Sequence, residues 1–111
     1  MIENAPSTVA MSAYSLAALT GPTTKPQLLS AFAAYQFKAS PEQLDEALSI
    51  AVDRGLMAFD SDAGTYAAKG PRGWVAMDRD PNDPGGWNGW VCKNLATGEK
   101  KMLDTLLKEP A

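Results

Sequence analysis

Side chains that could do chemistry are few in this chain, and their types argue against catalysis. The 111 residues include no histidine and a single cysteine, Cys92. Histidine is the commonest general base and transition-metal ligand, and a thiolate cage for a metal needs several cysteines. Gly85-Gly86 is followed by Trp87, so it lacks the lysine and hydroxyl residue of a phosphate-binding loop. We therefore expect no catalytic residue, no cofactor and no enzymatic activity.

The best candidate for a metal site is the loop Asp78-Arg79-Asp80-Pro81-Asn82-Asp83, which carries oxygen-bearing side chains at alternate positions. Such spacing suits a hard cation like calcium. An EF-hand loop, however, has glycine at its sixth position and glutamate at its twelfth. Here these positions hold Asp83 and Gly89, and the prolines at 81 and 84 restrict how the chain can wrap around an ion. We therefore expect a solvated, turn-forming loop and no metal.

Three tryptophans, each beside a glycine, form a second constellation: Trp74, Trp87 and Trp90. They are either the core of a small C-terminal sheet or, because glycine leaves the indole faces uncovered, anchors for a partner. In the second case Trp87 and Trp90 are the partner-binding residues of this segment. The sequence leaves both interpretations open.

Charge is divided unevenly along the chain. The formal net charge is −3 and the pI is near 4.8, whereas a nucleic-acid-binding domain usually carries a clustered positive excess. The segment from Lys69 to Lys108 nevertheless holds seven cations and five anions. A nucleic-acid surface, the alternative to a protein-binding one, would use six of these cations together with tryptophan stacking: Lys69, Arg72, Arg79, Lys93, Lys100 and Lys101.

Two helix starts follow one another in the N-terminal half, Thr24-Lys25-Pro26-Gln27 and Ser40-Pro41-Glu42-Gln43. In each, a hydroxyl residue and a glutamine three residues later can cap the first turn reciprocally, and proline occupies a position that needs no donor. The pattern predicts helices over residues 9–19, 25–38 and 41–54, ended by glycine at 21 and 55. The second helix is expected to bury Leu28, Ala31, Phe32 and Tyr35.

The third predicted helix has the clearest amphipathic pattern. Leu44, Ala47, Leu48, Ala51 and Val52 form its inner stripe. The outer face then carries Glu42, Asp45, Glu46, Ser49, Ile50 and Asp53. Carboxylates repel the phosphates of DNA, so we expect weak binding of random duplex DNA and a protein partner with a basic surface instead.

After the third helix come an apolar run at 56–59, the turn Ser61-Asp62-Ala63-Gly64 and a second run at 65–68. The order helix, turn, helix, hairpin over about residues 8–69 resembles a winged helix of the helix-turn-helix superfamily. Residues 1–7 are interpreted as a polar leader. Residues 70–111 are interpreted as an appended element with strands at 74–77 and 87–95 and a turn at 96–99. After the turn, either residues 100–103 form a third strand or residues 99–108 form a short helix; we favour a strand first and a short helical end. The expected fold is a single α+β domain.

The resemblance implies a family rich in transcription regulators and protein-interaction modules. We prefer a non-enzymatic regulatory or inhibitory module that binds a protein through Glu42, Asp45, Glu46, Ser49 and Asp53, through Trp87 and Trp90, or through both sets. The alternative is a DNA-binding regulator that dimerises through the first helix; a structural subunit of a larger assembly is a third class. By analogy, such a chain suits a virally encoded inhibitor. One cysteine, the absence of a signal-peptide pattern and the absence of a long apolar run predict a cytoplasmic protein without a membrane span.

Overall fold

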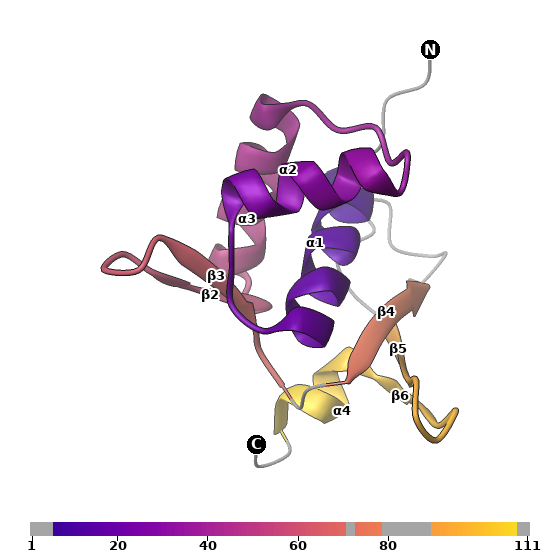
Figure 1. The fold of residues 1–111 in the computed structure, drawn as a ribbon. Coiled ribbons are helices and arrows are strands. Elements are labelled where there is room, and N and C mark those ends of the chain that lie inside the picture. Colours follow the sequence, from indigo (N-terminus) through magenta and orange to yellow (C-terminus); the bar gives the residue numbers. More distant parts are fainter. Residues whose placement is uncertain (1–5, 71–72, 79–89, 109–111) are drawn as a thin grey trace.

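The structure is a computed structural model that describes residues 6–70, 73–78 and 90–108. These residues form four helices and two small antiparallel sheets of three strands each, an α+β fold (Figure 1). The three longer helices and the first sheet come from the N-terminal part of the chain, and the second sheet and the last helix come from the C-terminal part. The expected fold class is thus confirmed at the level of α+β.

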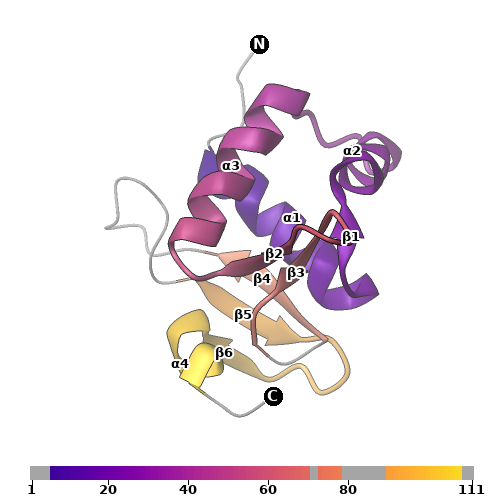
Figure 2. The same ribbon diagram turned by 90° about the vertical axis from the view of Figure 1, so that its left-hand side faces the viewer.

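Helix α1 (Pro6–Thr20) packs against α3, β3 and β4, so it is covered on several sides within one chain. Figure 2 shows it between the other helices and the second sheet. The helix begins at Pro6, and Ser7 is buried, so the last two residues of the segment interpreted as a polar leader belong to the core helix. The helix ends as expected: Gly21 has φ +90°, and its N–H donates to the Ala17 carbonyl oxygen at 2.8 Å.

Strand β1 (Thr23–Thr24) leads directly into α2 (Lys25–Ala34). The expected capping box is present, because the Thr24 hydroxyl accepts from the Gln27 amide and the Gln27 side chain accepts from the Thr24 amide. The helix ends at Ala34, four residues before the predicted end. Gln36 has φ +58°, which a continuing helix does not allow.

The early end of α2 corrects one prediction about the core. Tyr35 is 75% exposed, whereas Leu28 and Phe32 are buried as expected. Phe37 returns to the core: its N–H donates to the Phe32 carbonyl oxygen at 2.8 Å, and the two ring centroids are 4.9 Å apart. The 3.6-residue periodicity assigned Tyr35 to the inner face, but the chain leaves the helix before that residue.

Helix α3 (Pro41–Asp53) follows the predicted pattern at both ends. Ser40 and Gln43 form the second capping box. At the other end, Gly55 has φ +78°, and the Leu56 N–H reaches back to the Ala51 carbonyl oxygen at 2.9 Å, as in a Schellman motif. Leu44, Ala47, Leu48 and Ala51 are buried, and Val52 packs against the core at its edge.

The predicted hairpin is formed by β2 (Met57–Asp60) and β3 (Thr65–Ala68), which project from the body of the molecule in Figure 1. Strand β1 pairs with β3, so the sheet order is β1-β3-β2. In the connecting turn, the Asp60 carboxylate accepts from the amides of Asp62 and Ala63. Phe59 remains 49% exposed but stacks on Tyr66 across the strands, with ring centroids 4.7 Å apart.

The C-terminal segment forms a meander of β4 (Trp74–Asp78), β5 (Val91–Asn94) and β6 (Lys100–Met102), followed by α4 (Leu103–Lys108). The expected order of a strand and then a short helix is confirmed. The middle strand is shorter than predicted, because residue 90 is not part of it. The acidic loop considered for calcium lies outside the described residues beyond Asp78.

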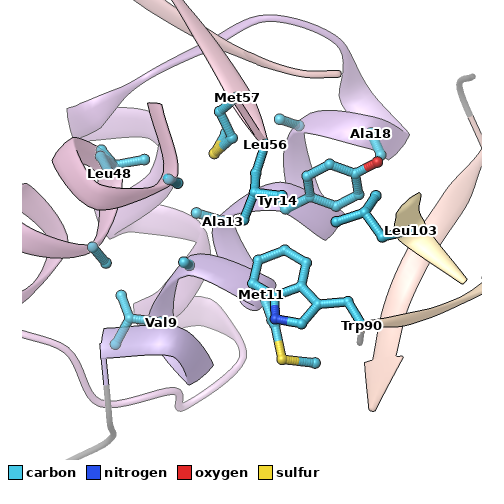
Figure 3. Packing of buried hydrophobic residues seen from close by; sticks show 14 of the residues in the cluster. Val9, Met11, Ala13, Tyr14, Ala18, Leu48, Leu56, Met57, Trp90 and Leu103 are labelled. Carbon is cyan, nitrogen blue, oxygen red and sulfur yellow. The ribbon is translucent and has the colours of Figure 1, made fainter. Parts of the chain in front are cut away.

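One hydrophobic core joins the two sheets through α1. Figure 3 shows Tyr14 of α1 amid Leu56, Leu103 and Trp90, which come from three other parts of the chain. The Tyr14 hydroxyl donates to the Lys69 carbonyl oxygen at 2.6 Å. The Ser15 hydroxyl accepts from the Ala76 amide at 2.9 Å. None of the described helices has both the length and the apolar character needed to cross a membrane.

Candidate functional site

The outer face of α3 is the candidate docking surface predicted from the sequence. Five of its polar side chains are exposed: Glu42, Asp45, Glu46, Ser49 and Asp53. Ile50 is half-buried at the border. The orientation follows from the opposite stripe, because burial of Leu44 and Leu48 against α1 leaves only the polar residues facing outward. The structure therefore brings together every α3 residue that was assigned to this surface.

Asp45 differs from the other carboxylates of this face because it forms an ion pair with Lys25 at the start of α2. The hydrogen bond that the Lys25 ammonium group donates to the Asp45 carboxylate is the main cause of the raised pKa of Lys25. Both side chains are well exposed to solvent, so the pair adds little to stability. Its consequence is local: one of the four carboxylates is already neutralised, and Glu42, Glu46 and Asp53 supply the free negative charge.

The tryptophans assigned to a partner surface require a correction. Trp90 is 1% exposed, and its ring meets Tyr14 edge-on with centroids 5.8 Å apart. Trp74 is 5% exposed. Both side chains are therefore part of the core. The C-terminal segment has few aliphatic side chains, so the two indoles fill the space between the second sheet and α1. Trp90 is therefore not an accessible anchor, and Trp87 lies outside the described residues.

The six cations proposed for a nucleic-acid surface do not lie on one face of the described structure. Lys93 and Lys100 are direct cross-strand partners on β5 and β6. Lys101 projects to the opposite face of that sheet, where its Nζ lies 3.7 Å from a Glu99 carboxylate oxygen and 5.7 Å from the centre of the Trp74 ring. Lys69 is exposed and follows β3 of the first sheet. Arg72 and Arg79 lie outside the described residues.

The direct opposition of Lys93 and Lys100 is a feature that the sequence analysis missed. The signal was present in the chain, because the turn at 96–99 sets the register of the two strands that it joins. The Gly98 and Asn94 amides close that turn through bonds to the Asn94 and Glu99 carbonyl oxygens at 2.7 and 2.8 Å. Asn94 thus pairs with Glu99, and the next residue along each strand pairs Lys93 with Lys100.

Cys92 lies on β5 in the second sheet and is fully buried. Burial raises the pKa of its thiol to about 11. A buried thiol of this kind is unreactive, because the thiolate is the nucleophile and the ligand. The described residues contain no group of three or more histidine, cysteine, aspartate or glutamate side chains that could hold a metal ion.

The raised thiol pKa predicts how stability depends on alkaline pH. The folded state favours the protonated thiol, so this contribution is complete below the unfolded pKa of 9.0 and is lost as the pH rises toward about 11. Burial also raises the pKa of Tyr14, which acts in the same direction at higher pH. We expect the Tm to fall between about pH 9 and pH 11, and Cys92→Ala to reduce this fall. A thiol reagent at pH 8 should label the unfolded chain quickly and the folded chain slowly; equally fast labelling of both would show that Cys92 is accessible.

Comparison with protein-family models, with curated proteins and with solved structures gave no match to this chain.

Proposed function

We propose that this chain is a non-enzymatic regulatory or inhibitory module that binds another protein through the outer face of α3. The observation that carries the proposal is the division of this helix into an apolar stripe packed on the core and an exposed acidic face. Because the core uses the inner side chains, a partner can contact only the outer ones. A partner with a basic surface is complementary to Glu42, Glu46 and Asp53.

We infer that residues 6–69 form a winged-helix-like architecture. Support comes from the order of α2, a turn, α3 and the hairpin β2–β3, and from α1 packing behind α3. In such a module the outer face of α3 is the natural docking surface.

A dimeric DNA-binding regulator is the alternative that the same architecture suggests. In such a regulator α3 would enter a groove of the DNA and approach the backbone phosphates, which are contacted by lysine or arginine. On α3 the carboxylates outnumber the cations, and the Lys25 ammonium group already pairs with Asp45. The charge of this face therefore supports a protein partner over DNA.

Charge reversal on α3 tests the proposal. Glu46→Lys combined with Asp53→Lys should preserve the fold, because both side chains are exposed. A lysine at position 46 would lie one turn after Glu42, and a lysine at position 53 would lie at the helix C-terminus; both placements are favourable. We expect association with a basic protein partner to slow about 10-fold or more at low salt, with a smaller effect at high salt. The partner is obtained by capture on the immobilised chain after nuclease treatment, and the rates are measured by surface binding kinetics.

A matched control makes the same change in net charge elsewhere. Asp62→Lys combined with Asp104→Lys alters two exposed residues on the hairpin turn and α4. Its association rate should stay close to that of the parent, and circular dichroism should confirm that both variants are folded. If the α3 variant and the control associate equally well, the α3 face is not the docking surface. In a parallel capture without nuclease, recovery of nucleic acid alone would favour the DNA-binding alternative.

A further inference from the structure

The outer face of the second sheet places two like charges in direct opposition. Lys93 on β5 and Lys100 on β6 are cross-strand partners. The Asn94 amide bonds to the Glu99 carbonyl oxygen, so the next pair outward is a non-hydrogen-bonded one, in which side chains approach most closely. Like charges in this position are destabilising. The arrangement therefore costs the fold stability rather than adding to it.

The ion pairs between described side chains do not include either of these two lysines. Neither Lys93 nor Lys100 forms an ion pair with a described residue, because the nearby Glu99 carboxylate pairs with Lys101 on the opposite face. Lys100 is exposed and Lys93 is half-buried. An anionic group that bridges both ammonium groups would remove the repulsion, and an acidic segment of a partner can supply such a group.

Apolar side chains lie next to the lysine pair on the same face. Val91 and Met102 are the neighbouring cross-strand pair, two residues along each strand. Met102 is 43% exposed and Val91 is half-buried. Exposed methionine adapts to the shape of aliphatic side chains on a partner. The surface thus offers an apolar half and a cationic half, about 6–7 Å apart along the strands.

We propose that this face, formed by Val91, Lys93, Lys100 and Met102, binds an acidic segment of a protein partner that carries aliphatic and carboxylate side chains on one side. An extended peptide places such side chains the required distance apart at every second residue. The described part of this face has no exposed aromatic ring, which a stacking platform for unpaired bases would need. Protein is therefore favoured over nucleic acid. This surface is separate from α3 and does not depend on the function proposed for that helix.

The test uses the full chain and a peptide of Leu-Ser-Glu-Ser repeats, with a Leu-Ser-Gln-Ser peptide as its control. We expect the acidic peptide to bind at low salt with a Kd below about 1 mM. The NMR chemical shifts of the chain's backbone amides should then change most on β5 and β6. The Gln peptide should bind at least about 10-fold more weakly. Absence of binding, equal binding of the two peptides, or shift changes confined to α3 would each overturn the proposal.

Lys100→Glu should change the Tm and the binding of the acidic peptide in opposite directions, which is not expected if Lys100 has only a structural role. It converts the repulsive pair into an attractive one, so we expect the Tm to rise by about 1–5 °C while acidic-peptide binding weakens about 10-fold or more. Lys69→Glu makes the same charge change at another exposed lysine and should leave binding within about 2-fold of the parent. Equal loss in both variants would show that only net charge matters.

Two further arms separate the alternatives. The Glu46→Lys and Asp53→Lys variant should bind the peptide like the parent, so failure of α3 docking and failure of this surface give different results. A single-stranded DNA oligonucleotide should not displace the peptide. Displacement by DNA at lower concentration than unlabelled peptide would reassign the face to nucleic acid and overturn the proposal.

Discussion

Leu48→Ala should lower the free energy of unfolding by about 2–5 kcal/mol. Leu48 is fully buried on the inner stripe of α3, in the cluster that joins this helix to α1 and β2. Removing its branched end leaves a cavity that the surrounding helices cannot close completely. For a domain whose total stability is about 5–15 kcal/mol, such a loss shifts the denaturation midpoint strongly.

The neighbouring position supplies the control for this experiment. Ser49 is exposed on the same helix, so Ser49→Ala should change stability by no more than about 0.5 kcal/mol. Urea unfolding followed by circular dichroism measures both variants. If Leu48→Ala unfolds at the same midpoint as the parent, the orientation of α3 is wrong, and the acidic docking face defined by that orientation is wrong with it.

Trp90→Ala should cost about 3–5 kcal/mol and should act on the whole molecule. Trp90 is buried where the second sheet meets α1, and its ring packs edge-on against Tyr14. Its backbone carbonyl oxygen also accepts from the Leu103 amide at 2.7 Å, which links the start of β5 to α4. Loss of the indole therefore weakens the packing of the C-terminal segment onto the N-terminal helices.

The shape of the unfolding transition distinguishes a shared core from separate units. We expect far-UV circular dichroism of the helices and tryptophan fluorescence to change together in the variant, at a lower midpoint than in the parent. Trp90→Phe, which keeps an aromatic edge against Tyr14, should lose less stability. A C-terminal sheet that melts early while the helices keep the midpoint of the parent would contradict the shared core.

Several features of the fold could be predicted because they depend on neighbouring residues. Both capping boxes, the glycine ends of α1 and α3 and the turn before β3 use contacts over a few residues, which the local sequence determines. The α3 surface was predicted for the same reason: a helix with one apolar stripe has only one way to face the core. The exposed acidic residues follow directly from that choice.

Other features required the packed chain. The sequence left Trp74 and Trp90 open between core and surface, because their burial depends on packing against α1, which lies about 60–80 residues earlier in the chain. Tyr35 was assigned to the core by periodicity and is exposed, because the chain turns at Gln36 to return Phe37 to the core. Long-range packing decided both outcomes.

By itself, the sequence determined the capped starts of α2 and α3, the glycine ends of α1 and α3, the polarity of the α3 face and the α+β order of the elements, since each follows from hydrogen bonds and periodicity within one segment. Only the tertiary structure decided which carboxylate of that face is paired: Lys25 at the start of α2 neutralises Asp45 on α3. The turn at 96–99 sets the register that pairs Lys93 with Lys100, but only the packed sheet placed Lys101 beside Trp74 and the Glu99 carboxylate. The physical reason is that the free energy of a charge depends on what surrounds it, and those surroundings exist only after distant segments have packed together.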